Sequence, residues 1–338
     1  MSLRLVQLRS GDTRRVAVVE EPNLRLLATD SIYALAGEAI GRNVKLSEVT
    51  REKWTNELIE YDAVYERNSP WGILPSIDHP EDSAHCLVSG TGLTHLGSAR
   101  DRQAMHLKPR AAEQEEQLTD SMKMFRWGLE GGRPTAGCVG TSPEWFYKGT
   151  GAILRAHNEP LDVPDYAEDG GEEAEIAGVY IIGPDGIPFR IGMTTGNEFS
   201  DHCFEKRNYL YLASSKLRNC AIGPELVVDP EFSAVPGQVT VRRNGQTVWS
   251  KEIRTGEAEM CHSLQNIEHH HFKFGEHRRP GDVHVHFFGA DCLSFGEGIR
   301  LSDGDVMRIR FEGFGRPLEN VVRLNAKNST PTTVVALE

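Results

Sequence analysis

Acidic side chains stand at the start of an apolar run that is typical of a buried β-strand. Glu173 and Glu175 precede this run, which extends over residues 176–182. Because residues two apart in an extended chain project from the same face, these two carboxylates are expected to point together. Carboxylates without partners are costly to bury, so the arrangement requires either a solvated strand end or a bound cation.

A third carboxylate can join them from the next segment of the chain. The sequence GPDG at residues 183–186 predicts a tight turn, and residues 188–193 then form a strand that leads into a polar turn with Glu198. Three converging carboxylates form an all-oxygen site, which suits Mg²⁺, Mn²⁺ or Ca²⁺ better than Zn²⁺. The spacing alone leaves open a solvated acidic hairpin.

The composition excludes several classes of protein. The 338 residues carry a formal net charge of −12, with 39% hydrophobic and 25% charged residues, as in an ordinary globular protein. A nucleic-acid partner would require a concentrated basic surface, which the sequence lacks. No run approaches the roughly 18 apolar residues of a membrane span, and the N-terminal residues lack the apolar core of a secretory signal. We therefore predict a cytoplasmic protein without a membrane partner.

The cysteines show no spacing typical of a zinc site, which predicts reduced and mostly buried thiols. They stand singly along the chain at Cys86, Cys138, Cys203, Cys220, Cys261 and Cys292.

Residues 1–75 are predicted to form a small N-terminal α/β domain. The expected elements are strands at residues 3–8 and 14–20 and helices at residues 30–40 and 50–65, where apolar residues recur at three and four. Three prolines, Pro70, Pro75 and Pro80, then interrupt regular structure and predict a connector over residues 68–82.

Residues 76–338 are predicted to form a second domain in which strands dominate, so the fold class is α+β. A strand at residues 86–90 ends in a glycine-rich turn with Thr94 and His95, and residues 108–130 have the periodicity of a surface helix. From residue 135 onward, short apolar segments alternate with Gly, Pro and Asp, which indicates hairpins. The expected strands lie at residues 177–183, 188–193, 224–228, 238–245, 247–253, 282–289 and 305–313, with one helix at 263–274.

Several stretches resemble the fumarylacetoacetate hydrolase superfamily, and their order is more specific than any one of them. They run from PEWFYKGTGAIL through GGEEAEIAGVYIIG, FRIGMTTGNEFSDH and YLYLASSKLRNCAIGPEL to RPGDVHVHFFGADCLSF with LSDGDVMRIRFEGFGRPLENVV. Together they cover residues 140–325. The resemblance implies that the catalytic domain is the mixed β-sandwich or roll of that family and that the protein is a homodimer.

The resemblance also implies a metal site, residue by residue. Glu173 and Glu175 match the E-x-E metal ligands of the family, and Glu198 stands where most members have the shorter Asp. Lys216 matches the active-site lysine. The implied cation is Mg²⁺ or Mn²⁺, which chelates a 2-oxo acid and stabilises the enolate formed when a proton leaves the adjacent carbon.

One departure from the family pattern bears on the reaction. Hydrolytic members activate a water with a His-x-x-Glu pair, whereas this chain has His95 followed by Ser98, with Asp101 as a possible substitute. Because a β-elimination consumes no water, the departure favours a dehydratase. The stretch EKRNYLYLASSK at residues 205–216 also resembles the branch that dehydrates 2-keto-3-deoxy sugar acids.

We therefore predict a metal-dependent dehydratase that converts a 2-keto-3-deoxypentonate to 2,5-dioxopentanoate. The alternatives that stay open are hydrolysis of a 2,4-dioxo acid, other lyase or isomerase chemistry on a 2-oxo acid, and non-catalytic binding of a sugar acid.

Two residues are predicted to be catalytic. Lys216 would remove the C3 proton, because burial near a cation would lower its pKa, or it would anchor the polarised oxo acid. His95 would protonate the leaving C4 hydroxyl. The predicted substrate contacts are Lys148, Arg190, Asn197, Ser215 and, because Ala290 replaces a threonine of relatives, backbone amides near Gly289.

Histidines at residues 269–271, 284 and 286 offer a weaker zinc-site alternative. Three consecutive helical residues point about 100° apart and cannot all meet one ion, whereas His284 and His286 share a strand face. We interpret these histidines as structural or as lining a cavity, with Glu268 or His271 facing it.

Overall fold

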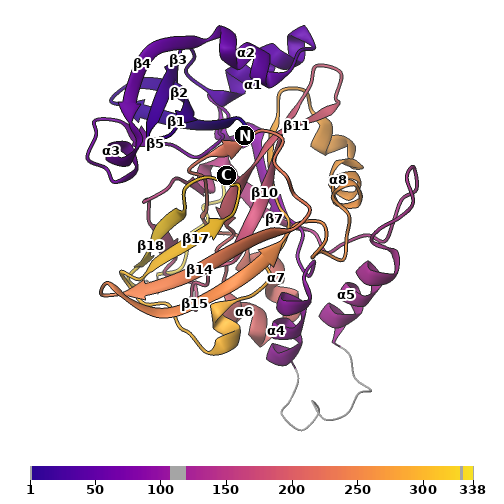
Figure 1. The fold of residues 1–338 in the computed structure, drawn as a ribbon. Coiled ribbons are helices and arrows are strands. Elements are labelled where there is room, and N and C mark those ends of the chain that lie inside the picture. Colours follow the sequence, from indigo (N-terminus) through magenta and orange to yellow (C-terminus); the bar gives the residue numbers. More distant parts are fainter. Residues whose placement is uncertain (1, 107–118, 328–329, 338) are drawn as a thin grey trace.

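Two β-sheets form the body of the protein in the computed structural model, which describes residues 2–106, 119–327 and 330–337 (Figure 1). The larger sheet has thirteen strands, and its main path runs β4-β3-β2-β1-β13-β11-β10-β16-β6-β7. Its strands are β1 (Arg4–Ser10), β2 (Thr13–Glu20), β3 (Asn23–Leu27), β4 (Trp54–Glu60), β5 (Gly72–Ile73), β6 (Cys86–Gly90), β7 (Phe146–Thr150), β8 (Leu154–Arg155), β10 (Ala174–Ile182), β11 (Pro188–Asn197), β12 (Cys220–Ile222), β13 (Leu226–Val227) and β16 (Val283–Phe287).

The smaller sheet has five strands in the order β15-β14-β17-β18-β9. Its strands are β9 (Leu161–Val163), β14 (Val235–Arg243), β15 (Gln246–Thr255), β17 (Val306–Phe311) and β18 (Leu318–Leu324). The α-helices are α1 (Ile32–Arg42), α2 (Leu46–Glu52), α3 (Tyr61–Tyr65), α4 (Leu96–His106), α5 (Asp120–Gly131), α6 (His202–Arg207), α7 (Leu212–Ser215) and α8 (Leu264–Phe272). Strands outweigh helices, which confirms the predicted α+β, β-dominated fold class.

The antiparallel pair β10 and β11 lies at the centre of the larger sheet. Its register sets Glu175 opposite Gly196, and the turn between the strands falls at the predicted residues. Alternate side chains of β10 enter two different cores. Ile176 packs in the core shared with the smaller sheet, whereas Val179 packs in the core beneath α1. The strand pair is therefore buried on both faces.

The predicted strands at residues 3–8 and 14–20 and the helix at 30–40 are confirmed as β1, β2 and α1. The Ser31 hydroxyl caps α1 by accepting from the backbone N–H of Ala34, and Asn43 ends the helix with φ 52°. Strand β1 pairs with β13, so the N-terminal strands continue the larger sheet. The division of the chain at residue 75 stays a prediction.

The helix predicted over residues 50–65 is wrong. The structure has α2, then the strand β4, then α3 in this region. Leu58 and Trp54 gave the helical spacing, but both side chains are about half exposed. Pairing of β4 with β3, which sets Ile59 opposite Leu24, overrides the local pattern.

The predicted strands after residue 135 are all present, and the helix at 263–274 appears as α8. The Asn-Gly hairpin is confirmed, because Asn244 and Gly245 join β14 to β15 with φ values of 51° and 78°. Of the helix predicted over 108–130, only α5 can be compared, because residues 107–118 lie outside the described residues. Within the described ranges, no helix combines the length and the apolarity needed to span a bilayer.

A buried carboxylate connects the N-terminal strands to the rest of the larger sheet. Glu225 accepts a 2.9 Å hydrogen bond from the Tyr61 hydroxyl and a 3.0 Å bond from the backbone N–H of Arg316, and it lies 3.1 Å from the Arg4 guanidinium. Its own backbone carbonyl accepts from the Thr194 hydroxyl of β11. Glu225 therefore links the N-terminal strands to β11, the strand that ends at Asn197, next to Glu198.

We expect Tyr61→Phe to lower the free energy of unfolding by about 1–2 kcal/mol, because a buried carboxylate oxygen loses a donor. Urea denaturation at pH 7 measures the change. The control is Tyr147→Phe, whose partly exposed hydroxyl has no hydrogen bond within the described chain. That control should change stability by less than about 0.5 kcal/mol. Equal stabilities for the two variants would contradict the assigned contact.

Candidate functional site

Three buried carboxylates meet where β10 begins and β11 ends. One oxygen from each of Glu173, Glu175 and Glu198 lies within 4.8 Å of the other two, and the three residues are at most 4% exposed. Asn197 shapes the turn, because its side-chain oxygen accepts from the backbone N–H groups of Glu173 and Phe199, each at 3.3 Å. The two strands thus bring the carboxylates together as predicted, and the solvated-hairpin alternative is wrong.

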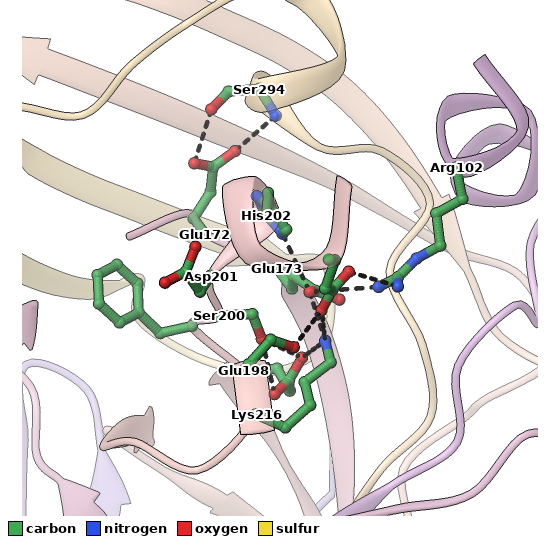
Figure 2. Close-up of polar contacts among 12 residues, drawn as sticks. Arg102, Glu172, Glu173, Glu198, Ser200, Asp201, His202, Lys216 and Ser294 are labelled. Carbon is green, nitrogen blue, oxygen red and sulfur yellow. Dashed lines mark hydrogen bonds and ion pairs between the residues drawn. The ribbon is translucent and has the colours of Figure 1, made fainter. Parts of the chain in front are cut away.

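Lys216 places a positive charge inside this cluster (Figure 2). Its ammonium group lies 2.6 Å from Glu173 and 2.5 Å from Glu198. Burial disfavours the charged lysine, but attraction by Glu173, Glu198 and Glu205 outweighs burial and raises the pKa of Lys216 above its usual value. The sequence predicts a lowered pKa for Lys216, but the protein groups that surround it raise its pKa instead.

Glu175 differs from its two neighbours, because no cationic side chain of the described residues forms an ion pair with it. Its Oε2 accepts a 2.7 Å hydrogen bond from the backbone N–H of Gly289. Burial, together with repulsion by Glu198 and Glu173, raises the pKa of Glu175 well above its usual range. The amide of Gly289, which was predicted to bind substrate, is thus engaged by a carboxylate.

Position 289 requires glycine. Its φ is +96°, and a Cβ there would lie 2.0 Å from the Thr94 hydroxyl oxygen. The Thr94 hydroxyl in turn donates to the backbone carbonyl of Phe288. This close packing fixes the amide that binds Glu175.

The donor set fits a hard divalent cation. Lys216 and Lys148 form ion pairs with Glu173 and Glu198, whereas the charge of Glu175 is offset by no cationic side chain in the described chain. Carboxylate oxygens are the ligands that Mg²⁺, Mn²⁺ and Ca²⁺ prefer. A divalent cation held by Glu173, Glu175 and Glu198 would remove the repulsion among them.

Glu173 is surrounded by donors that the sequence analysis did not identify. Its Oε1 lies 2.6 Å from the Lys216 ammonium, 3.1 Å from His202 Nε2 and 3.5 Å from the Arg102 guanidinium (Figure 2). Burial raises the pKa of Glu173, but these donors together outweigh it and hold the pKa well below its usual range. No motif spacing links Arg102 to Glu173, because they lie far apart in the chain.

Lys148 of β7 lies in the cluster, but its ammonium group is occupied by the protein. It pairs with Glu198 and donates to the backbone carbonyls of Phe199 at 2.7 Å and Lys216 at 3.1 Å. The Ser200 hydroxyl also donates to Glu198. Lys148 thus holds the turn and its carboxylate, and its contacts do not include a free donor for substrate.

Two predicted substrate contacts, Arg190 and Ser215, bond to other protein groups. Arg190 sits near the opposite end of β11 from Asn197, where it forms an ion pair with Glu268. Arg190 lies opposite Tyr180, toward the other end of the strand pair from the carboxylate cluster. The substrate contact of Arg190 and the cavity-facing role of Glu268 stay predictions. The Ser215 hydroxyl donates to Glu205 at 2.7 Å and so supports the cluster from behind.

His95 is buried and lies between two hydroxyl groups. Its Nδ1 is 2.8 Å from the Thr94 hydroxyl, and its Nε2 is 3.2 Å from the Thr255 hydroxyl. Burial lowers the pKa of His95 to about 4, so the ring is neutral at pH 7. Both ring nitrogens are therefore engaged, which weakens the predicted role of His95 as a proton donor to substrate.

The histidine-rich segments form no separate metal centre among the described residues, where the three glutamates are the only group that could hold an ion. His271 Nε2 lies 3.0 Å from His284 Nδ1, and His286 is bonded to the hydroxyls of Ser89 and Thr91, both at 2.8 Å. These contacts support the structural interpretation.

Glu144 is a further site residue that spacing did not predict. Its Oε2 is buried without a hydrogen-bond partner in the described chain, while its Oε1 accepts from the Tyr209 hydroxyl. Burial raises the pKa of Glu144, and the nearby charges of Arg102 and Lys216 only partly oppose it. Glu144 lies within the stretch PEWFYKGTGAIL, two residues before β7, but the family pattern for that stretch does not include it.

Glu175→Gln is expected to raise the melting temperature of the metal-free protein at pH 8 by at least about 2 °C. The folded-state pKa of Glu175 is raised, so above about pH 4.5 the native state retains a proton that the unfolded state releases, and wild-type stability falls as the pH rises. Glutamine cannot ionise, so the advantage of the variant should grow from pH 5 to pH 8.

Thermal unfolding in chelator measures the repulsion. A second series with added Mg²⁺ measures metal binding, because Mg²⁺ should stabilise the wild type and not the variant. Glu57→Gln on the exposed face of β4 is the control and should show neither effect. A variant that is less stable than wild type at pH 8 in chelator would contradict the repulsion described here.

No known family model matches the chain. The chain is 28% identical to a probable 2-keto-3-deoxyxylonate dehydratase from Haloferax volcanii over 183 residues. The alignment covers 51% of this chain and 58% of that protein. The alignment thus spans little more than half of the length of that relative.

Solved structures match almost the whole chain. A 2-keto-3-deoxyarabinonate dehydratase has a TM-score of 0.70 at 18% identity, covering 96% of this chain and 100% of that one. A 2-keto-3-deoxy-D-arabinonate dehydratase complexed with magnesium and 2,5-dioxopentanoate has a TM-score of 0.69 at 18% identity, with the same coverage. A fumarylacetoacetate hydrolase from Exiguobacterium antarcticum has a TM-score of 0.59 at 18% identity, again covering 96% and 100%. The chain therefore has the fumarylacetoacetate hydrolase-like fold that these dehydratases share, which confirms the resemblance seen in its motifs.

Proposed function

We propose that the protein is a metal-dependent dehydratase that converts a 2-keto-3-deoxypentonate to 2,5-dioxopentanoate. The observation that carries this proposal is the buried convergence of Glu173, Glu175 and Glu198 around Lys216. The similarity to dehydratases of 2-keto-3-deoxypentonates supports this choice of substrate. We also propose a homodimer, which rests on the family resemblance, and a cytoplasmic location, which we predict from the sequence.

In the overall reaction, C3 loses a proton and C4 loses its hydroxyl as water. A proton then moves from C5 to C3, and the resulting C5 enol passes its hydroxyl proton to C4 to give the aldehyde. A Mg²⁺ ion bound by the three glutamates would stabilise negative charge on the C2 oxygen while C3 is deprotonated. Lys216 is held as an ammonium ion by its carboxylate partners, so it acts as the anchor for a substrate oxygen, the second of its two predicted roles.

Glu144 is the group that we propose to move protons at C3 and C4. Its Oε2 is buried, has no hydrogen-bond partner among the residues that the structure describes, and belongs to a carboxyl whose pKa is raised by burial. A raised pKa brings a carboxyl group closer to the working pH, where it can both accept and donate a proton. His95 is less suited to this task, because its ring is neutral and bonded to two hydroxyls.

The hydrolase alternative requires a group that activates water, and the structure does not favour it. The predicted substitute, Asp101, packs its carboxylate against Gly296 and accepts a hydrogen bond from the backbone of Leu293. Neither contact orients His95, whose two nitrogens meet Thr94 and Thr255. The dehydratase needs no such dyad.

The purified protein with Mg²⁺ should form a semialdehyde from D- or L-2-keto-3-deoxypentonate and should leave acylpyruvates unchanged. Product formation is followed by mass spectrometry and by an aldehyde-specific reagent. Exhaustive chelation should abolish turnover, and Mg²⁺ should restore it. Pyruvate as the sole product, or turnover that survives chelation, would reject the assignment.

Glu144→Gln should lower kcat by about 10²- to 10⁴-fold, the range expected for loss of a general acid or base. Mg²⁺ affinity, measured by calorimetry, should stay within about twofold of wild type, because Glu144 is not among the three converging carboxylates. Glu130→Gln, on the exposed side of α5, is the matched control and should retain full activity. Unchanged kcat in Glu144→Gln would remove this residue from the mechanism.

A further inference from the structure

Arg102 reaches the carboxylate cluster from α4, which lies outside residues 140–325, the range of the stretches that carry the family resemblance. The residue is 4% exposed, and its guanidinium spans two carboxylates (Figure 2). One terminal nitrogen lies 2.5 Å from Glu205, and the other lies 3.5 Å from Glu173. The planar fork of arginine suits such a bridge, which a lysine cannot reproduce.

Glu205 of α6 completes the bridge. It is 1% exposed, accepts a 2.7 Å hydrogen bond from the Ser215 hydroxyl, and lies 3.5 Å from the Lys216 ammonium. Lys216 is therefore within reach of three carboxylates, of which Glu173 and Glu198 hold it at shorter distances. Arg102 offsets the charge of Glu205 and so leaves Lys216 with the other two.

We propose that Arg102 and Glu205 form a positioning pair for the metal ligand Glu173. The pair holds one carboxylate oxygen of Glu173 in place from the side of α4, and it keeps Lys216 from moving toward Glu205. Neither residue touches the substrate or the ion. This inference rests on the metal binding in the proposed function and extends it to two residues that lie behind the ligands.

Charge and orientation act in opposite directions when Arg102 is removed. Loss of a positive charge near the site favours any cation, whereas loss of the bridge frees Glu173 and lets Glu205 compete for Lys216. Only variants that keep the net charge can separate the two effects. Arg102→Lys keeps the charge and loses the fork, and the double variant Arg102→Met with Glu205→Gln removes one charge of each sign.

Isothermal titration of the metal-free, full-length protein with MgCl₂ measures the positioning effect directly, without substrate or turnover. We expect the double variant to bind Mg²⁺ about 10- to 100-fold more weakly than wild type, as for other groups that orient metal ligands. Arg102→Lys should fall between the two. The matched control is Arg100→Lys, an exposed arginine on the same helix, which should bind Mg²⁺ as wild type does.

Thermal unfolding in chelator shows whether each variant is folded. If the double variant proves unstable, Arg102→Lys, which retains a buried cation, still tests the positioning pair. Wild-type Mg²⁺ affinity in folded Arg102→Lys and in the folded double variant would overturn the positioning pair and leave the proposed function intact. A wild-type protein that binds no Mg²⁺ would overturn both.

Discussion

The site depends on one electrostatic constraint, which is the burial of several like charges at one point. Two carboxylates about 5 Å apart repel each other by roughly 3 kcal/mol at an effective dielectric constant near 20. The amide of Gly289 contributes a single hydrogen bond to Glu175, which is worth about 1.5–3 kcal/mol and does not offset repulsion from two neighbours. The repulsion is therefore relieved by cationic side chains, by a bound ion or, in the metal-free protein, by a proton on Glu175.

The protein supplies positive charge unevenly. Lys148 and Lys216 come from β7 and from the end of α7, and Arg102 and His202 come from α4 and α6. All four favour Glu173 or Glu198, and Glu175 forms no ion pair within the described residues. Elements that are far apart in the sequence thus supply positive charge to Glu173 and Glu198. The uncompensated charge of Glu175 gives the site its affinity for a cation.

Much of this arrangement could be predicted from local patterns. The spacing of Glu173, Glu175 and Glu198 on a hairpin follows from strand periodicity and a recognisable turn, and the strands after residue 135 have clear boundaries. Arg102, Glu144 and Glu205 could not be predicted, because their roles depend on which helix packs beside which strand. The failure at residues 50–65 has the same origin, since pairing with β3 decided the structure there.

The central claim is that Glu173, Glu175 and Glu198 bind one divalent cation. Anomalous diffraction from crystals soaked in Mn²⁺ tests it most directly, because the ion is then located without reference to activity. The account predicts a single strong peak within about 2.0–2.5 Å of an oxygen from each of the three carboxylates. Full-occupancy Mn²⁺ bound elsewhere, with these three carboxylates free of it, would contradict the account.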